Sequence, residues 1–198
     1  PDWTRVGGLM QDLPDTAVFQ RMVKKFLSQD LAKAIDDMEG LLNRNRNPSL
    51  SRTDIEGHLR DYLGVSTVLW LGRGVYNDET DGHVDNLCCF LRPGVVALAW
   101  TDDEEDPQYP ISCDALVRLT ALRDARGRAL EVVKLPIPSR PVVMSEAEAA
   151  EVEHVPGSQP RPAGFRLAAS YVNFLIVNDA IILPAFGDPH DARAASIL

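Results

Sequence analysis

Residues 87–135 read LCCFLRPGVVALAWTDDEEDPQYPISCDALVRLTALRDARGRALEVVKL, and the architecture is clearest from this stretch. Leu87–Leu91 and Val95–Trp100 are apolar runs of strand length, and they predict two strands. Pro93-Gly94 between them is a turn signal, so the strands are expected to form a hairpin. A helix and then a third strand are expected next, at 112–124 and 130–135. The stretch therefore predicts a ββαβ unit.

The segments on either side of this unit repeat parts of the same order of elements. A helix that starts with the capping pair Ser51 and Asp54 and ends before Gly64 is followed by a predicted strand at Val65–Leu71. After the unit, two strands and a helix are predicted at 170–177, 180–186 and 188–198. A ββαβ unit cannot cover its own apolar face, so we expect the chain to be the middle of a larger, modular α/β domain.

Two further helices are predicted outside this repeat. Apolar residues recur near a 3.6-residue period over 16–42, which predicts a long amphipathic helix. Ser145 and Glu148 form a capping box, which predicts a short acidic helix. The predicted organisation is one domain over 1–198, with an atypical helical segment at 1–42 and the modular part at 43–198.

The composition excludes several classes of protein. The chain has 198 residues, of which 45% are hydrophobic, and this is typical of a globular domain with a sizeable core. The net charge of −9 argues against a nucleic-acid-binding protein, which needs a basic face. No apolar run approaches the roughly 18–20 residues of a membrane span. No signal peptide is visible, and the three cysteines form no disulfide framework, so a cytoplasmic location is expected.

A polar stretch between two predicted strands is the candidate functional site. Tyr76–Asn86 reads YNDETDGHVDN and holds four carboxylates and a histidine. If the chain becomes extended near Gly82, His83 and Asp85 point to the same face, because a strand has a side-chain period of two. An imidazole beside a carboxylate suits proton transfer next to an anionic clamp for a cation.

Other interpretations of this stretch stay open. An acidic surface loop would have the same composition. A calcium-binding loop does not fit, because Cys88 stands where the twelfth position requires Glu if Gly82 is the sixth. His83 and Asp85 are both suitable ligands for Mg²⁺ or Zn²⁺, but no second His or Cys ligand pattern accompanies them.

The stretch Trp70–Asn86, WLGRGVYNDETDGHVDN, resembles the signature of the agmatine deiminases, which belong to the peptidylarginine-deiminase-like group of guanidine-modifying enzymes. The likeness extends over about residues 41–190. It includes LLNRNRNP at 41–48, LAWTDD at 98–103, KLPIP at 134–138 and SYVNF at 170–174. The resemblance implies a pentein-type fold, a five-bladed α/β propeller of ββαβ units around a substrate tunnel, of which this chain would hold a part.

The resemblance also implies hydrolysis of agmatine to N-carbamoylputrescine and ammonia, a step towards putrescine that needs no metal or organic cofactor. In this family a Cys thiolate attacks the guanidinium carbon, a His protonates the departing ammonia and then activates water, and carboxylates hold the guanidinium. By this resemblance His83 and Asp85 are the catalytic pair: His83 is the general acid/base, and Asp85 binds the guanidinium. Asp81 and Glu39 are further candidates for substrate binding. The alternative for Glu39 is a solvated residue at a helix end.

The family nucleophile lies in a Gly-Gly-Asn-Ile-His-Cys motif, which these 198 residues do not contain. Cys88 and Cys89 are predicted to be core residues, and Cys113 is predicted to be structural. Together with the start at Pro1, this predicts a fragment that shows no turnover of agmatine alone. A partial propeller exposes strand edges, so we also expect poor solubility or homo-oligomers. Two alternatives remain, a degenerate non-catalytic domain that binds polyamine-like cations and an acidic metal-binding module.

Overall fold

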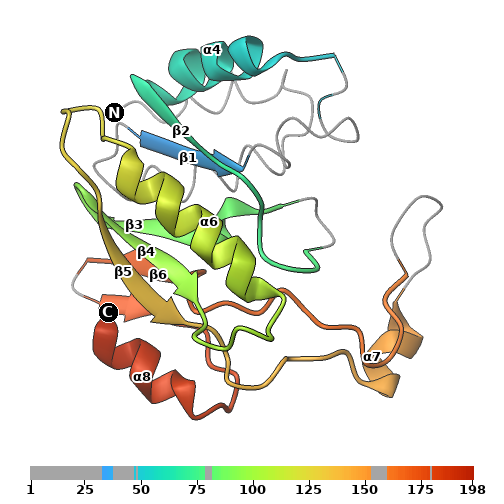
Figure 1. Cartoon of the computed structure of the whole chain (residues 1–198). Helices are drawn as coiled ribbons and strands as arrows, with labels where there is room; N and C mark the ends of the chain where they lie inside the picture. The colour runs from blue at the N-terminus through green and yellow to red at the C-terminus, as the bar shows by residue number, and fades with distance from the viewer. Residues whose placement is uncertain (1–32, 38–46, 48, 79–81, 153–159, 179) are drawn as a thin grey trace.

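A computed structural model describes residues 33–37, 47, 49–78, 82–152, 160–178 and 180–198 (Figure 1). Within these ranges the fold is α/β, with three small sheets, and none of the helices combines the length and hydropathy that a membrane crossing requires. In chain order the elements are β1 (Lys33–Asp37), α4 (Arg52–Leu63), β2 (Thr67–Leu71), α5 (Val84–Leu87), β3 (Cys88–Arg92), β4 (Val95–Trp100), α6 (Gln108–Ala121), β5 (Glu131–Pro136), α7 (Glu146–Glu151), β6 (Leu175–Val177), β7 (Ala180–Ile182) and α8 (His190–Ile197).

The predicted ββαβ unit is confirmed. Strands β3 and β4 pair antiparallel, with Cys88 opposite Leu98, and β5 pairs parallel with β4 after the crossover helix α6. Pro93 and Gly94 form the turn between β3 and β4. Gly94 has φ +83, a left-handed conformation that residues with a side chain rarely adopt. The sheet order is β3-β4-β5, so β4 is the central strand.

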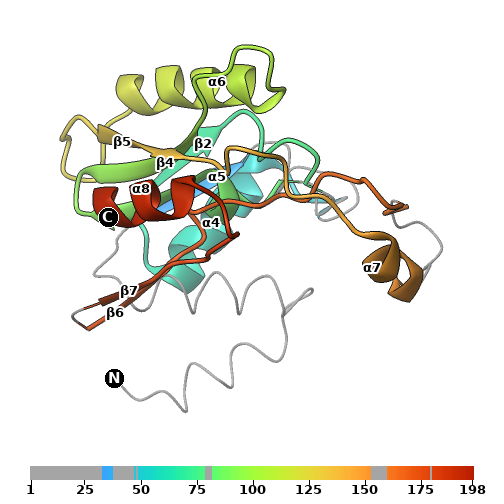
Figure 2. The same cartoon turned by 90° about the horizontal axis from the view of Figure 1, so that it is seen from below.

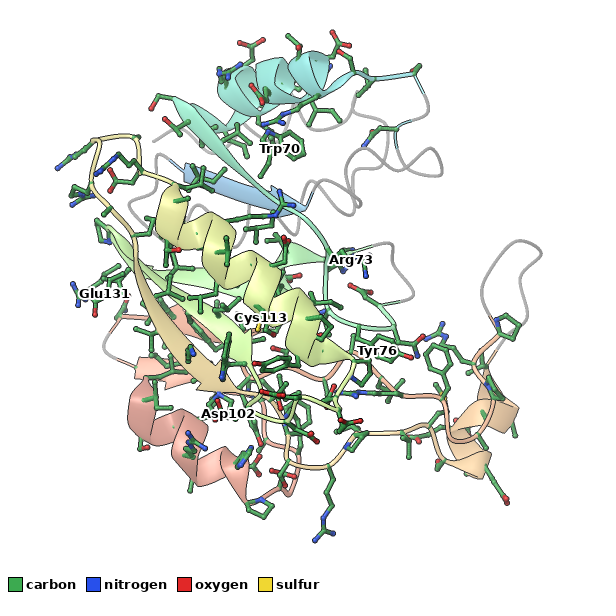
Figure 3. All side chains as sticks on the ribbon, in the orientation of Figure 1. Trp70, Arg73, Tyr76, Asp102, Cys113 and Glu131 are labelled. Carbon is green, nitrogen blue, oxygen red and sulfur yellow. The ribbon has the colours of Figure 1, made fainter. Side chains whose placement is uncertain are left out.

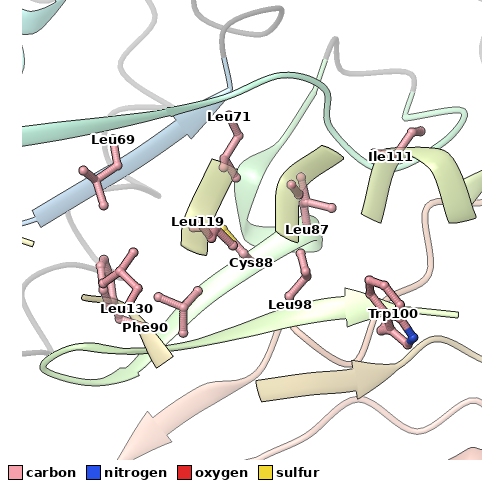
Figure 4. Packing of buried hydrophobic residues seen from close by; sticks show 12 residues of the cluster. Leu69, Leu71, Leu87, Cys88, Phe90, Leu98, Trp100, Ile111, Leu119 and Leu130 are labelled. Carbon is pink, nitrogen blue, oxygen red and sulfur yellow. The ribbon is translucent and has the colours of Figure 1, made fainter. Parts of the chain in front are cut away.

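Strand β4 is buried on both faces because helices cover both. Val96, Leu98 and Trp100 belong to the cluster that contains the apolar face of α6 (Figure 4). Ala97 and Ala99 alternate with them and belong to a second cluster, which includes residues of α8. Figure 2 shows α6 on one side of the sheet and α8 on the other. A strand that is covered on both faces is expected to be a continuous apolar run, and VVALAW is such a run.

The units on either side contain parts of the same arrangement. Strands β1 and β2 pair parallel, with Ile35 opposite Leu69, and α4 connects them. Strands β6 and β7 form an antiparallel hairpin, with Ile176 opposite Ile181, and α8 follows it. The order of elements inferred from the sequence is therefore present on both sides of the central unit.

The prediction of a helix over 16–42 is wrong for residues 33–37, the part of this range that the structure describes. Residues 33–37 form β1, in parallel register with β2. The rest of 16–42 lies outside the described residues. Over five residues an apolar spacing is compatible with a helix or a strand, and here pairing with a distant segment decides for the strand.

Helix α6 begins earlier than the sequence predicts, at Gln108 instead of residue 112. Pro110 lies in the first turn, where the missing backbone N–H costs no helical hydrogen bond. The carboxylate of Asp106 accepts a hydrogen bond from the Gln108 backbone N–H at 2.8 Å and so satisfies one of the donors that a helix start leaves open.

Four predicted strands, β2, β3, β5 and β6, start later than expected. Strand β3 starts at Cys88, because residues 84–87 form α5, and β6 starts at Leu175. Residues 170–174 are turns and irregular chain, where the Val172 backbone N–H donates to the Ser170 hydroxyl at 3.1 Å. Such a side-chain bond offers the backbone an alternative to a strand ladder.

The two predicted capping boxes are confirmed. Asp54 accepts from the Ser51 backbone N–H at 2.9 Å at the start of α4, and Glu148 accepts from the Ser145 backbone N–H at 2.8 Å at the start of α7. These serines also donate their hydroxyls, which lowers the pKa of both carboxyl groups. Gly64 ends α4 in a left-handed conformation, as predicted.

Two aspartates fix the start of α8. Asp191 accepts from the Tyr171 hydroxyl at 2.5 Å and from the backbone N–H groups of residues 186–188. The Tyr171 hydrogen bond lowers the pKa of Asp191, and burial raises the pKa of Tyr171. Asp188 accepts from the backbone N–H groups of Ser139, Arg140 and His190.

The free energy of unfolding is expected to fall as the pH drops from 3.8 to about 2. Burial raises the pKa of Asp188, but the N–H donors outweigh it and bring the pKa from 3.8 to about 2. Because the unfolded carboxyl group binds its proton first, this contribution to stability is present above pH 3.8 and is lost as the pH falls to about 2. Asp188→Asn should flatten this decline in urea unfolding measured between about pH 2 and about pH 5. Glu151→Gln, at the exposed end of α7, is the control; an unchanged decline in Asp188→Asn would contradict the prediction.

Candidate active site

His83 and Asp85 lie at the start of α5, next to the central sheet. His83 is the N-cap residue, with φ −84 and ψ 112, and Asp85 is in the first turn. Both are half-buried. Cys88 ends α5 and is also the first residue of β3, so the helix continues directly into the sheet. The predicted extended chain from Gly82, with both side chains on one strand face, is wrong because residues 84–87 are helical.

The helical turn follows from the packing of two apolar residues. Leu87 is fully buried, and Val84 packs against the cluster that lies between the sheet and α6. Residues three apart meet on one face of a helix, whereas in a strand they would point to opposite faces. The sequence prediction took the alternation around His83 as the signal and missed this spacing.

Hydrogen bonds hold this segment at both ends. The backbone N–H of His83 donates to Asp78 Oδ2 at 2.7 Å. Asn86, the residue after Asp85, accepts at its Oδ1 from Asn173 Nδ2 at 2.9 Å. Tyr171, two residues before Asn173, is fully buried and donates its hydroxyl to Asp191 instead. Asn173 therefore contacts the site segment without Tyr171.

A buried polar chain supports the loop that precedes the site. Gln108 is 1% exposed, and its Oε1 accepts from the Tyr76 backbone N–H at 2.8 Å. Its Nε2 donates to the Ser112 hydroxyl at 3.1 Å, and that hydroxyl donates to the Ala99 carbonyl oxygen at 2.8 Å. These three hydrogen bonds tie the loop through α6 to the central strand β4.

Arg166 supports the same loop from another side. Its backbone carbonyl oxygen accepts from Asn77 Nδ2 at 2.9 Å, and Asn77 has φ +60. Its guanidinium forms two hydrogen bonds of 3.0 Å with Asp106 and lies 5.6 Å from the centre of the Tyr76 ring. Figure 3 shows Arg73 and Tyr76 on the segment after β2, with Tyr76 near the start of α6.

The other predicted site residues are placed as follows. Glu39 and Asp81 lie outside the described residues. Cys88 and Cys89 are buried in the two clusters on opposite sides of the sheet, as core residues are expected to be. Cys113 is half-buried within α6 and does not begin the helix. Among the described residues, no three His, Cys, Asp or Glu side chains are grouped to hold a metal ion.

Four supporting residues were missed by sequence reasoning: Asn77, Gln108, Ser112 and Arg166. Gln108 and Ser112 are four apart on α6 and would share a helix face in a helix that starts at 108. The helix predicted at 112–124 does not include Gln108, so this spacing could not be recognised from the sequence. No local pattern marks Arg166, because its contact with Asn77 spans 89 residues.

A pocket of about 370 Å³ opens where β4 and β5 end. Lys134 Nζ lies 3.4 Å from the centre of the Trp100 ring, and Trp100 Nε1 donates to Asp102 at 2.7 Å. The residues that line the pocket do not include His83 or Asp85, so we do not assign it to the candidate site.

A sequence profile of the Porphyromonas-type peptidyl-arginine deiminases matches residues 34–198, which is most of the chain. The chain belongs to this family. Two curated relatives are the agmatine deiminases of Ectopseudomonas mendocina and Pseudomonas aeruginosa, which are 60% and 58% identical to the chain over 161 residues. The match covers 81% of this chain and 43% of each relative, so the chain spans less than half the length of these proteins.

Solved structures with the same fold lead to the same family. The agmatine deiminase of Enterococcus faecalis is 42% identical, with a TM-score of 0.77, over 83% of this chain and 45% of that one. A Cys-to-Ser variant of the C. jejuni agmatine deiminase with substrate bound is 25% identical, with a TM-score of 0.66, over 94% of this chain and 55% of that one. The membership in the deiminase family that the sequence resemblance implied is therefore confirmed.

Proposed function

We propose that the chain takes part in the hydrolysis of agmatine to N-carbamoylputrescine and ammonia, within putrescine biosynthesis. One observation carries the proposal. The chain is 60% identical over 161 residues to an agmatine deiminase. The fold agrees with this, because His83 caps the short helix α5 and Asp85 is in its first turn.

His83 is proposed to move protons in both halves of the reaction. A thiolate attacks the guanidinium carbon, and the C–N bond to the leaving nitrogen breaks as His83 gives that nitrogen a proton, so ammonia departs. The carbon stays bound to sulfur until water attacks it and His83 takes a proton from that water. The C–S bond then breaks, which releases N-carbamoylputrescine and regenerates the thiolate. A histidine suits this exchange because it works as acid and base near neutral pH.

Asp85 is proposed to bind the substrate guanidinium. A carboxylate matches a planar guanidinium with two parallel hydrogen bonds, which fixes both its place and its orientation. Asp85 is in the first turn of the helix that His83 caps, so both residues belong to the same end of α5. Asp81 and Glu39 remain candidates for additional contacts. The net charge of −9 favours the approach of a cationic substrate.

The nucleophilic thiol is proposed to come from another segment of polypeptide. Cys88 and Cys89 are buried in apolar clusters, Cys113 lies within α6, and none of the three stands in a Gly-Gly-Asn-Ile-His-Cys motif. Burial in apolar surroundings disfavours a thiolate. On this proposal the 198 residues alone do not turn over agmatine. The chain together with the segment that supplies the thiol is called the active preparation.

The complete fold is proposed to be a five-bladed propeller of ββαβ units. The central unit and its two partial neighbours support this arrangement. The β6–β7 hairpin also supports it, because four of its apolar side chains are exposed: Leu175, Val177, Ile181 and Ile182. Apolar surface of this kind is usually covered by another part of a protein. Homo-oligomers of the isolated chain stay a prediction on the same grounds.

Asp85→Asn tests the proposal in an active preparation. The variant keeps the size of the side chain but removes the charge, so KM for agmatine should rise about tenfold to a hundredfold, as expected when a charged hydrogen-bonding partner is lost. Asp61→Asn on the exposed side of α4 is the control and should leave KM unchanged. If both variants have the parent's kcat and KM, or if carbamoylputrescine is not formed, the proposed function is wrong.

A further inference from the structure

The backbone of His83 is held by a carboxylate that the reaction itself does not use. We propose that Asp78 is a positioning residue, which sets the place of the His83 imidazole through its hydrogen bond to the His83 backbone. The inference rests on the proposed role of His83 as general acid/base. It adds a residue that acts on the reaction only through another residue.

The first step concerns the weakness of α5 itself. The helix has four residues, and its N-cap residue, His83, makes no side-chain capping bond. So short a helix has little stability of its own, and its first backbone N–H groups need partners from elsewhere. Asp78 Oδ2 supplies a partner at 2.7 Å, and a bond to an ionised acceptor is stronger than a neutral one.

The second step concerns Asp78, which can fix His83 only if its own segment is fixed. The two preceding residues are held by distant parts of the chain: Tyr76 by the buried Gln108, and Asn77 by the Arg166 carbonyl oxygen. The Asp78 backbone N–H also donates to the Val75 carbonyl oxygen at 3.2 Å. These bonds fix the position of the Asp78 carboxylate relative to α6 and β4.

The third step concerns the other end of the segment. Strand β3 follows α5 without a break and pairs with β4, so the sheet fixes the chain from Cys88 onward. The core also holds Val84 and Leu87, but neither residue directs the chain before the helix. The bond from Asp78 is therefore the contact that fixes the His83 backbone on the N-terminal side of α5. A displacement of about 1 Å at a catalytic group can cost about a hundredfold in rate.

Amide hydrogen exchange measures this bond directly in the chain. Asp78→Ala should accelerate exchange at the His83 N–H about tenfold or more, since the bond to a charged acceptor is lost. Asp78→Asn keeps an acceptor oxygen but loses the charge, so exchange should fall between that of the parent and that of Asp78→Ala. Glu148→Ala is a matched control, because Glu148 bonds to the backbone N–H of another N-cap residue, Ser145. It should accelerate exchange at Ser145 and leave His83 unchanged.

Turnover by an active preparation is the second measurement. Asp78→Ala should lower kcat for agmatine about tenfold to a hundredfold with KM within about threefold, because the substrate contacts remain and the proton donor is displaced. Asp78→Asn should restore most of kcat. A residue that only stabilised the fold would instead change the exchange of sheet amides such as Val96 and would not be rescued in this way.

The outcomes separate this inference from the proposed function. Unchanged exchange at His83 in Asp78→Ala overturns the inference whatever the activity. Faster exchange at His83 with unchanged kcat, in a preparation that His83→Ala inactivates, also overturns it. If Asp78→Ala unfolds the sheet, Asp78→Asn decides: partly retained protection of the His83 N–H and most of kcat support the inference, and their loss with an intact sheet overturns it. If His83→Ala retains activity, the proposed function has failed, and the positioning of a catalytic imidazole fails with it.

Discussion

His83→Ala is expected to lower kcat for agmatine by about 10³-fold to 10⁴-fold in an active preparation. The proposed mechanism uses the imidazole twice, to protonate the leaving nitrogen and to deprotonate water, and alanine can do neither. KM should change much less, because the guanidinium is held by carboxylates. Initial rates of ammonia release over a range of agmatine concentrations would measure both quantities.

His58→Ala is the matched control for this experiment. His58 lies on the exposed side of α4, where its ring is 6.0 Å from that of Tyr62, and it has no place in the proposed site. Its removal should leave kcat within about twofold of the parent, as for other surface changes. A His83→Ala variant that keeps more than a tenth of the parent's kcat would rule out the acid/base role.

Leu98→Ala is expected to lower the free energy of unfolding by about 3 to 4 kcal/mol. Leu98 is fully buried at the centre of β4, and its cluster contains residues of β2, β3, α5 and α6 (Figure 4). The neighbouring strands are held by their ladders and cannot collapse into the space, so the cost should include a cavity as well as the lost apolar burial. Urea unfolding followed by circular dichroism would measure it.

Val117→Ala supplies the comparison for the core variant. Val117 lies on α6 but is 67% exposed, so its truncation leaves no cavity and should change the free energy of unfolding by less than about 0.5 kcal/mol. Equal effects of the two variants would mean that the β4–α6 contact is not the core of the protein.

The parts of the fold that could be predicted are those that local chemistry decides. A few neighbouring residues are enough to predict the turn at Pro93-Gly94 and the helix caps at Ser51 and Ser145. The same holds for β4, whose continuous apolar run indicates a strand buried on both faces. Strand β1 could not be predicted, because it is a strand only through its pairing with β2. The early start of α6 was missed because Pro110 usually marks a loop, although the first turn of a helix accepts proline.

In the candidate site, too, the residues of one local motif could be predicted and the contacts between distant segments could not. His83 and Asp85 could be named from the sequence because they stand in one short signature, and Trp70–Asn86 also led to the correct family. Their local geometry was predicted wrongly, since the helical spacing of Val84 and Leu87 outweighs the alternation of the polar residues. The support from Gln108 and Arg166 depends on contacts across 32 and 89 residues, which no local pattern reveals.

The direct junction of α5 with β3 restricts which genetic changes this region tolerates. Inserting or deleting one residue in Cys88–Arg92 would slide the strand by about 3.3 Å and exchange its two faces. Cys88 and Cys89 would then swap clusters, or the strand would keep its pairing and push the displacement back onto His83. The pairing is irregular between Phe90 and Arg92, which offers a place to absorb an extra residue, so a length change at Cys88 or Cys89 should be tolerated less well than one near Arg92.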